Sequence, residues 1–307
     1  MSDYQLVIIG GGPAGLTAGI YATRARIKTL LLEKTVPGGQ ITTSEWVENY
    51  PGFPEGISGF DLGELMKEQA VKHGLEIKSA EVIALEPGND AIIVKTASAS
   101  YAADTVIIAG GARYARLGVP GEEELAGRGL SFCATCDGPF FRDREVAVVG
   151  GGNIAVSDAI FLTRFSSRVY VIHRRDALRA DRILQERAFA NDKLEFLWDT
   201  VVEAINGTDK VTSLRLRNVK TDQVFTLEIG GVFMAVGTFP NTEYLAPLIQ
   251  LGQGGTIPVN IQMETQIPGI FAAGDIREGS IRQVVAAAGD GAIAAMAAQR
   301  YLEQLGQ

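Results

Sequence analysis

The sequence predicts an α/β fold with two nucleotide-binding domains, and two observations carry this prediction. First, the chain holds two glycine-rich turns, at residues 10–15 and 150–155, each between an apolar β-branched run and a helical pattern. Second, a shift of 140 residues superposes the two turns and also places Thr23 on Thr163, which indicates an internal duplication. We therefore expect two Rossmann-like domains of the three-layer β/β/α type, the second inserted in the first.

Composition excludes several classes of protein. The 307 residues are 46% hydrophobic and 21% charged, and they carry a net charge of −8 with an isoelectric point near 5.0. An acidic chain of this kind is not expected to bind nucleic acid, which needs a basic face. The apolar runs have only strand length, so no membrane span is predicted, and the first residues show no signal-peptide pattern. We therefore expect a soluble, cytoplasmic protein.

The first glycine-rich turn belongs to a complete strand–turn–helix–strand unit. Residues 5–9 form a continuous apolar run typical of a buried parallel strand, and a helical pattern continues from the turn to about Arg26. A second strand is predicted at residues 29–32, and it ends on Glu33. A lone G-x-G-x-x-G match is weak, but the whole arrangement is typical of dinucleotide binding.

Each residue type in this unit has a physical reason. Gly10 permits the tight turn, Gly12 lets the backbone approach a pyrophosphate, and Gly15 lets the helix pack on the strand. The helix N-terminus favours an anion, and Glu33 can accept hydrogen bonds from the ribose of a nucleotide such as FAD or NAD. The residues predicted to bind this nucleotide are Gly10, Gly12, Pro13, Ala14, Gly15 and Glu33.

The second turn follows another buried strand, at residues 145–149, and differs from the first at one informative position. His173 stands where the first unit has Glu33, and arginines follow it. A carboxylate suits a free ribose and repels a 2′-phosphate, whereas a basic cluster binds that phosphate. A solvated basic turn is the alternative, but the position of the cluster favours NADPH over NADH. The residues predicted to bind NADPH are Gly152, Asn153, Ile154, His173, Arg174, Arg175 and Arg179.

Other segments supply further candidate contacts to the nucleotides. Glycines and amides crowd two irregular stretches, at residues 38–43 and 47–52. Near the C-terminus, a short strand ends at Asp275, ahead of an alanine-rich helix predicted from about Ile281 to Leu302. On composition alone, these segments also fit ordinary surface loops and a capped helix. The additional predicted contacts are Gly39, Gln40, Asn49, Gly110, Gly237, Asp275, Arg282 and Gln283.

Cys133 and Cys136 are the only cysteines of the chain, and Asp137 follows them directly. Such a pair can close a small disulfide ring and reopen it by thiolate attack, with a nearby acid moving the proton. A structural disulfide closing so short a loop would constrain the unfolded chain little, and a zinc site needs about four ligands. The chain has two histidines, His73 and His173, and both lie far from the pair in sequence. We therefore expect Cys133, Cys136 and Asp137 to be catalytic residues in redox chemistry.

Together these motifs resemble the low-molecular-weight bacterial thioredoxin reductases over essentially the full length of the chain. The Cys-Ala-Thr-Cys-Asp segment at residues 133–137, just before the second glycine-rich strand, is highly specific to that family. The resemblance also covers both glycine-rich turns and the segments around Asn49, His173 and Asp275. One departure is Pro139. The family carries an aromatic pair for docking thioredoxin at the position directly after Gly138, whereas here Pro139 comes before Phe140 and Phe141.

The resemblance implies a homodimeric enzyme that binds FAD and NADPH and reduces thioredoxin. The FAD-binding domain would span residues 1–116 and 244–307, and the inserted NADPH-binding domain residues 117–243. Electrons would pass from NADPH through FAD to the Cys133–Cys136 disulfide, and the dithiol would reduce thioredoxin. By the same analogy, Cys136 faces the flavin, Cys133 attacks the partner disulfide and Asp137 donates or accepts the proton.

The residues leave two kinds of alternative function open. The same fold could serve another disulfide protein, act as a small-molecule dithiol oxidase, or draw electrons from ferredoxin. The arginines after His173 count against ferredoxin, since that reaction needs no clamp for a 2′-phosphate. A non-catalytic flavin redox sensor is the alternative of another class. It would need an effector surface, for which 307 residues leave little room beside two nucleotide domains.

Overall fold

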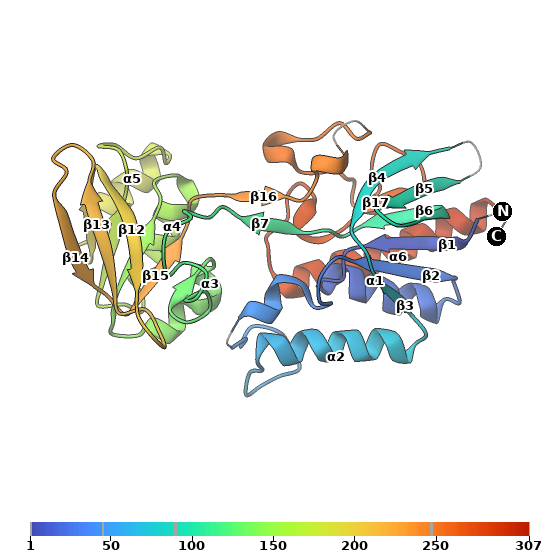
Figure 1. Ribbon diagram of the computed structural model, residues 1–307, viewed down its shortest axis with the longest axis horizontal. Helices are drawn as coiled ribbons and strands as arrows, with labels where there is room; N and C mark the ends of the chain where they lie inside the picture. The colour runs from blue at the N-terminus through green and yellow to red at the C-terminus, as the bar shows by residue number, and fades with distance from the viewer. Residues whose placement is uncertain (1, 45, 89–90, 246–247, 307) are drawn as a thin grey trace. The chain divides into compact units, whose positions relative to one another are not determined.

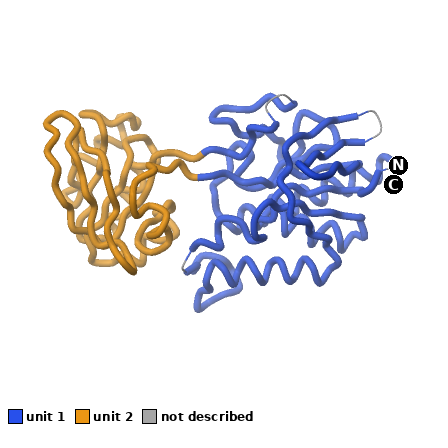
Figure 2. Tube along the Cα trace, viewed as in Figure 1, with its two compact units in different colours: residues 1–113, 239–307 blue, residues 114–238 orange. Residues whose placement is uncertain are grey.

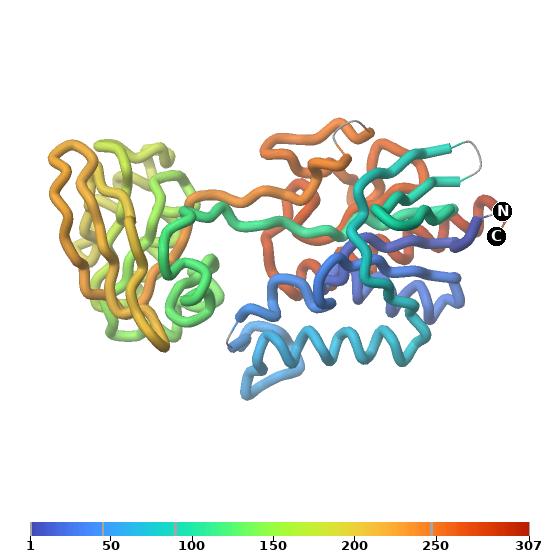
Figure 3. Tube along the Cα trace, viewed as in Figure 1, coloured from blue at the N-terminus to red at the C-terminus, as the bar shows by residue number. Residues whose placement is uncertain are grey.

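Apolar strands and amphipathic helices assemble into two α/β units (Figures 1 and 2). The computed structural model describes residues 2–44, 46–88, 91–245 and 248–306. Unit 1 comprises residues 1–113 and 239–307, and unit 2 comprises residues 114–238. The chain therefore leaves unit 1 in its middle and returns to it later, as Figure 3 traces in colour. The sequence prediction put the two boundaries slightly later, after residues 116 and 243.

Unit 1 is built on a seven-stranded sheet, counted over the described residues. Strands β1, β2, β3 and β17 run parallel to one another and to the second half of β6. The first half of β6 pairs with antiparallel β5, which pairs with β4, so the sheet continues into an antiparallel layer. The strands, in spatial order, are β3 (Glu76–Ser79), β2 (Thr29–Glu33), β1 (Tyr4–Ile9), β6 (Ser100–Ile108), β5 (Ile92–Thr96) and β4 (Val82–Pro87), with β17 (Ile270–Ala272) beside β6.

Helices α1 (Pro13–Arg24), α2 (Gly59–Lys72) and α6 (Val284–Gln304) complete unit 1. Helices α1 and α6 lie close together because small residues line their contact (Figure 1). A Cβ at Gly291 of α6 would overlap the carbonyl oxygen of Ala14, and Ala294 and Ala298 are fully buried in the same layer. Among the described residues, no helix combines the length and the apolar character needed to cross a bilayer.

Unit 2 repeats this layering around a five-stranded parallel sheet. Alternate residues of its strands face opposite layers: Val148 packs toward helix α4, whereas Val149 packs toward the antiparallel strands. In spatial order the parallel strands are β11 (Leu194–Leu197), β10 (Arg168–Ile172), β9 (Glu145–Val149), β15 (Gly231–Met234) and β8 (Leu130–Ser131). The other elements are α3 (Ala134–Asp137), α4 (Asn153–Leu162), α5 (Arg182–Phe189), β12 (Thr200–Asn206), β13 (Ser213–Asn218) and β14 (Val224–Glu228).

The two connections between the units run side by side as a two-stranded sheet of β7 (Ala112–Tyr114) and β16 (Thr238–Pro240). After β7, the chain enters unit 2 through a turn held by a buried carboxylate. The two carboxylate oxygens of Glu122 accept hydrogen bonds from the backbone N–H groups of Leu117 and Gly118, at 3.0 and 2.7 Å. The turn through which the chain enters is thus tied to unit 2.

Helix α2 begins at Gly59 because Ser58 caps it by accepting a hydrogen bond from the Asp61 N–H at 3.0 Å. Two local predictions differ from the structure. Helix α6 begins only at Val284, because Arg282 has a left-handed φ of 56° that a helix does not tolerate. The stretch at residues 38–43, predicted to be irregular, contains a 3₁₀ turn, η1 (Gly39–Thr43).

Asp158 is a half-buried carboxyl on α4, and burial raises its pKa to about 6 from the ordinary 3.8. The folded state therefore binds a proton more tightly than the unfolded state. Between the two pKa values stability falls as the pH rises, because the folded protein must ionise a carboxyl that has lost part of its hydration. Above about pH 6 the carboxyl is ionised in the folded protein, and the free energy of unfolding is lowered by the full cost of the buried charge.

We expect Asp158→Asn to stabilise unit 2 above pH 6 by up to about 3 kcal/mol, and to have little effect below pH 4. Thermal unfolding of both proteins between pH 4 and pH 8 measures this difference. Asp192→Asn, at an exposed position of the same unit, is the matched control and should show no such trend. A stability difference that is independent of pH would contradict the assignment.

Candidate functional site

Cys133 and Cys136 form a disulfide within unit 2, and no free cysteine remains. Cys133 precedes the four-residue helix α3, which carries Cys136 near its end. Both cysteines are half-buried, so the disulfide lies at the surface of the unit. In the part of the chain that the structure describes, no three side chains of His, Cys, Asp or Glu converge as metal ligands.

Hydrogen bonds tie this redox turn together. The backbone N–H of Cys136 donates to Sγ of Cys133 at 3.2 Å, and the N–H of Asp137 donates to the carbonyl oxygen of Cys133 at 3.1 Å. The hydroxyl of Thr135 lies 3.4 Å from Sγ of Cys133. The Cys136 N–H and the Thr135 hydroxyl thus lie beside Cys133 Sγ, where they would stabilise a thiolate once the disulfide opens.

Sequence reasoning missed Ser131, which contacts this turn from strand β8. Its hydroxyl donates to Oδ2 of Asp137 at 2.5 Å, and it accepts from the N–H of Cys133 at 3.0 Å. A buried serine two residues before the first cysteine was the available signal, but a single serine is too common to be informative alone. Of the predicted catalytic residues Cys133, Cys136 and Asp137, the structure thus shows that two, Cys133 and Asp137, are contacted by Ser131.

The two phenylalanines after the redox turn have different environments. Phe140 is 39% exposed, whereas Phe141 is buried and packs edge-on against Phe233, with ring centroids 5.1 Å apart. Both lie in the 3₁₀ turn η2 (Gly138–Phe141), in which Pro139 is the second residue. Of the displaced aromatic pair, only Phe140 presents its ring at the surface.

The first glycine-rich turn brings α1 to the edge of the unit 1 sheet. Gly10 has a φ of 105°, and a Cβ there would overlap the carbonyl oxygen of Ala109, at the end of the neighbouring strand. Around Gly12, in contrast, a Cβ would meet only Cα of Gly39, at 3.9 Å. Because the helix is preceded by glycines, no side chain competes for its first N–H groups. The turn therefore offers donors and open space to an anion.

Glu33 lies beside this turn, as the sequence predicts. One carboxylate oxygen accepts a hydrogen bond from the N–H of Gly11 at 2.6 Å, and the other accepts from the N–H and hydroxyl of Thr35 at 2.8 Å. A glutamine side chain follows further along the chain. Gln40 donates to the carbonyl oxygen of Ala112. The structure thus brings together Gly10, Gly12, Pro13, Ala14, Gly15, Glu33, Gly39 and Gln40.

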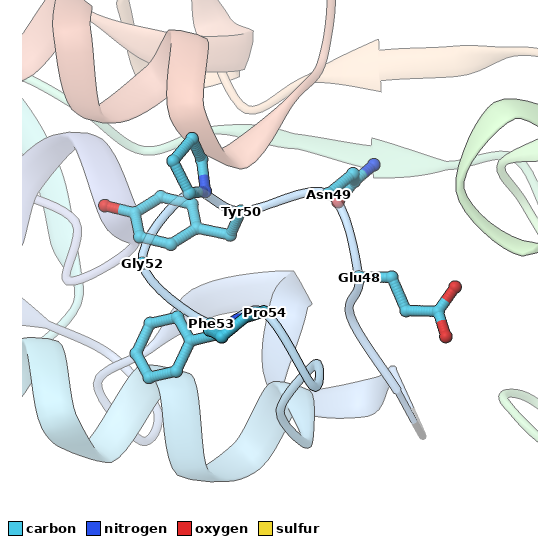
Figure 4. A pocket seen from close by; sticks show the side chains of 7 residues that line it. Glu48, Asn49, Tyr50, Gly52, Phe53 and Pro54 are labelled. Atoms are coloured by element: carbon cyan, nitrogen blue, oxygen red, sulfur yellow. The ribbon is translucent and has the colours of Figure 1, made fainter.

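Residues 48–54 line a cavity of about 350 Å³ in unit 1 (Figure 4). Asn49 lies on one side of it and Tyr50 on the other (Figure 4). The Asn49 amide donates to the side-chain oxygen of Gln283 at 3.3 Å, across 234 residues of sequence. Two of the predicted contacts, far apart in sequence, therefore meet through Asn49, which lines this cavity.

Asp275 lies in the 3₁₀ turn η5 (Gly274–Ile276), directly after β17. Burial raises the pKa of its carboxyl, and the hydroxyl of Ser280 donates to it at 3.0 Å. A second acid holds this turn and was not predicted. Buried Asp290 of α6 accepts two hydrogen bonds from Arg277, at 2.6 and 3.0 Å, and one from the N–H of Gly274, at 3.1 Å.

The remaining predicted nucleotide contacts are less closely grouped. The carbonyl oxygen of Gly110 accepts from the Asn241 side chain at 2.8 Å, so this glycine already has a protein partner. Arg282 is exposed and precedes α6, next to Gln283 at the helix N-cap. Gly237 lies in unit 2, where its carbonyl oxygen accepts from the N–H of Ala115 at 2.9 Å at the start of β16.

The second glycine-rich turn has the same geometry as the first. Gly150 has a φ of 150°, and a Cβ there would overlap the carbonyl oxygen of Ala235. No atom lies within 4 Å of a Cβ built on Gly152. Ile154 is 54% exposed, and Asn153 exchanges two hydrogen bonds of 2.8 Å with Asp181 at the start of α5. The turn therefore leaves an open approach to the N-terminus of α4.

His173 differs from its predicted place in a charged cluster. It is only 5% exposed, its ring packs on Gly151, and its Nε2 is buried without a hydrogen-bond partner. Burial lowers the pKa of this imidazole, and the neighbouring arginines lower it further. His173 is thus neutral at pH 7, and the idea that it adds positive charge is wrong.

Arg174, Arg175 and Arg179 supply the charge instead. All three side chains are exposed on the loop after β10. The backbone N–H of Arg179 donates to the carbonyl oxygen of Gly151 at 2.7 Å, which fixes the loop to the glycine-rich turn. The buried, unpartnered Nε2 of His173 and the open space at Gly152 lie at the same turn. These residues fit a bound nucleotide with its phosphates at α4 and a further anion at the arginines.

The sequence profile described as pyridine nucleotide-disulphide oxidoreductase matches residues 4–291. The chain belongs to this family. It is 48% identical to the thioredoxin reductase of Bacillus subtilis over 303 residues, covering 98% of this chain and 96% of the relative. It is 45% identical to the thioredoxin reductase of Listeria innocua, again over 303 residues, covering 98% and 95% of the two chains. The crystal structure of thioredoxin reductase from Streptococcus pyogenes superposes with a TM-score of 0.95 at 49% identity, covering 98% of both chains.

These comparisons confirm two predictions made from the sequence. The resemblance to the low-molecular-weight thioredoxin reductases holds over nearly the whole chain, and the fold has two Rossmann-like α/β domains. Members of the pyridine nucleotide-disulphide oxidoreductase family use a flavin and a pyridine nucleotide. The glycine-rich turns of both units provide the geometry that such nucleotides require.

We expect Gly152→Ala to leave the fold intact and to weaken pyridine-nucleotide binding. The backbone at Gly152 is extended, with a φ of −93°, so the added methyl group causes no strain, and it meets no atom of the protein. It would, however, fill the space where a pyrophosphate approaches, so the dissociation constant should rise at least about 10-fold. Fluorescence titration measures binding, and thermal unfolding measures stability.

Gly289→Ala is the matched control for this variant. Gly289 lies on α6 of unit 1, where an added Cβ also meets nothing. The control should bind the nucleotide normally and gain about 0.5–1 kcal/mol of stability, because alanine favours a helix. Unchanged nucleotide binding by Gly152→Ala would contradict the proposed position of the pyrophosphate.

Proposed function

We propose that the protein is a flavin-dependent thioredoxin-disulfide reductase that uses FAD and NADPH. The observation that carries this proposal is the Cys133–Cys136 disulfide on a nucleotide-binding unit that is inserted into a second one. The named relatives and the family agree with this reaction. Each unit would bind one nucleotide. The disulfide would pass electrons from these nucleotides to the protein substrate.

Unit 1 would hold FAD. The pyrophosphate would lie at the N-terminus of α1, over Gly12, with Glu33 beside the adenosine ribose. Asn49, Asp275 and Gln283 would orient the other end of the cofactor, because Asn49 and Gln283 already meet and Asp275 follows β17, which pairs with β6. Bound flavin supplies a two-electron relay between a nicotinamide and a disulfide.

Unit 2 would hold NADPH. Gly152, Asn153 and Ile154 would present the N-terminus of α4 to the pyrophosphate, and Arg174, Arg175 and Arg179 would bind the 2′-phosphate. His173 would contribute a buried hydrogen-bonding nitrogen rather than a charge. The basic loop also argues against a ferredoxin-linked enzyme, which has no 2′-phosphate to bind.

The redox turn would carry out the exchange with the protein substrate. Opening the disulfide breaks one S–S bond and adds two electrons and two protons. Cys133 would be the attacking residue, because the N–H of Cys136 donates to its sulfur and would stabilise its thiolate. Asp137 would move the proton, and Cys136 would be the sulfur that exchanges with the flavin. Exposed Phe140 would contact thioredoxin beside the turn.

The proposal includes a cytoplasmic homodimer. Exposed apolar side chains on adjacent helices of unit 1 support an interface between two copies there. They are Tyr21 on α1 and Val285, Ile293 and Met296 on α6. A cysteine pair that must be returned to the dithiol in every turnover fits a reducing compartment.

We expect the purified protein to be yellow and its flavin to be bleached faster by NADPH than by NADH at equal concentration. Replacing both Arg174 and Arg175 by Ala should weaken NADPH binding by about 2–4 kcal/mol and leave NADH nearly unaffected, because only NADPH carries the 2′-phosphate. Arg187→Ala, at an exposed position of α5, is the control. Equal use of NADH by the native protein would overturn the assignment of the arginine loop.

We expect Cys133→Ser and Cys136→Ser each to abolish NADPH-dependent reduction of thioredoxin while flavin reduction by NADPH remains. The reason is that electrons reach the flavin before they reach the sulfurs, and one sulfur cannot complete a two-electron exchange. Steady-state NADPH oxidation with thioredoxin measures turnover, and anaerobic bleaching measures flavin reduction. Turnover that persists in either variant would place the electron exit elsewhere.

A further inference from the structure

Ser131 contacts the redox turn from a fixed position in the framework of unit 2. It ends strand β8, pairs with Phe233 of β15 and is 5% exposed. Strand β15 in turn pairs with β9, within the parallel sheet. The serine is therefore held by the sheet, whereas the turn that begins two residues later contains only a four-residue helix.

Three polar groups of the turn lie within reach of the Ser131 hydroxyl. It donates to Oδ2 of Asp137 at 2.5 Å and accepts from the N–H of Cys133 at 3.0 Å, and the carbonyl oxygen of Cys133 lies 3.3 Å away. A serine hydroxyl has one proton and two acceptor lone pairs. Because the carboxylate is both charged and nearer, the single proton lies toward Asp137.

This set of partners suits Asp137 in both of its protonation states. When the carboxyl is ionised, Ser131 donates to it. When the carboxyl is protonated, its O–H can donate to a lone pair of Ser131 Oγ, and the serine proton can turn to the Cys133 carbonyl oxygen. The N–H of Cys133 keeps its acceptor in both cases. Only hydrogen atoms move, so the carboxyl group need not change its place.

We propose that Ser131 is a positioning residue that holds the carboxyl of Asp137 in place while it releases and regains a proton. The inference rests on the proposed function, since it assigns Asp137 a proton-transfer role. Reduction of the disulfide takes up two electrons and two protons, and a hydride supplies both electrons and one proton. Asp137 supplies the second proton and is reprotonated from solvent, so one solvent proton is consumed in each cycle.

The same carboxylate acts in exchange with a partner disulfide. It takes the proton of the attacking thiol and returns it to the thiolate that leaves the partner. In this step the dithiol loses two electrons and two protons, its S–S bond forms again, and the partner gains both electrons and both protons. Ser131 matters in both directions, because each requires Asp137 to change its protonation state next to the sulfurs.

The test uses the full-length, flavin-loaded protein and a comparison of two variants of nearly equal shape. Ser131→Thr keeps a hydroxyl, whereas Ser131→Val replaces it by a methyl group, and both fit a strand position. The Cys133–Cys136 pair is reduced with dithiothreitol, the reductant is removed, and the rate of reaction with a small aromatic disulfide is followed. We expect Ser131→Val to react about 10-fold more slowly, which is the effect of losing one hydrogen bond to a charged group, and Ser131→Thr to stay within about 3-fold of the native rate.

A double-mutant cycle with Asp137→Asn decides whether the serine acts through the aspartate. If it does, Ser131→Val should slow the native protein but add less than about 2-fold once Asp137 is replaced. Ser167→Ala, at an exposed serine of the same unit, is the control and should match the native rate. NADPH-driven turnover of thioredoxin by the Val variant should show a reduced kcat with an unchanged KM.

Three results would overturn the proposal. Ser131→Val could react at the native rate, Ser131→Thr could be as slow as Ser131→Val, or the effects of Ser131→Val and Asp137→Asn could be additive. The first result would mean that the hydroxyl has no role, the second that only side-chain shape matters, and the third that the serine acts independently of Asp137. The exchange assay requires neither NADPH nor thioredoxin. A failure of thioredoxin turnover in the native protein would thus count against the proposed function, but the exchange assay could still be interpreted.

Discussion

The structure depends on two close approaches between a glycine and the end of a neighbouring strand. In unit 1 the Cα of Gly10 lies against the carbonyl of Ala109, and in unit 2 Gly150 lies against the carbonyl of Ala235. Neither position has room for a Cβ, and both have a positive φ. These approaches bring the N-termini of α1 and α4 to the carboxyl edge of their sheets, where exposed N–H groups can meet phosphates.

The same turn is adapted to different chemistry in each unit by the side chain that packs on its second glycine. Glu33 accepts a hydrogen bond from Gly11 in unit 1, whereas His173 packs on Gly151 in unit 2. A carboxylate in one place disfavours a 2′-phosphate, and a neutral imidazole next to three exposed arginines permits it. Under the proposed function, one repeated framework would thus hold two nucleotides of opposite electrostatic preference.

Local patterns were sufficient to predict most of the framework. The glycine spacing, the β-branched strands and the offset between the two turns are properties of short segments, and the structure has the strands and helices close to where they were expected. The contact between Arg277 and Asp290 was not predictable, because it depends on the turn of η5 that returns the chain to α6. The neutrality of His173 was missed for a similar reason, since it follows from burial against Gly151 rather than from the residues adjacent in sequence.

Ser131 shows the same limit at the redox turn and explains why so small a segment can be ordered. A four-residue helix does not hold itself together, because nucleating a helix costs more than one turn of hydrogen bonds returns. The turn is instead fastened by side-chain contacts, from Ser131 on the sheet to both Cys133 and Asp137. The sulfurs therefore stay at the surface, where a protein substrate can reach them, while the acid beside them is anchored to the core of the unit. Accessible chemistry and fixed geometry are combined in one short segment, because the Ser131 hydroxyl links it to the sheet and Ala134 packs into the core beside it.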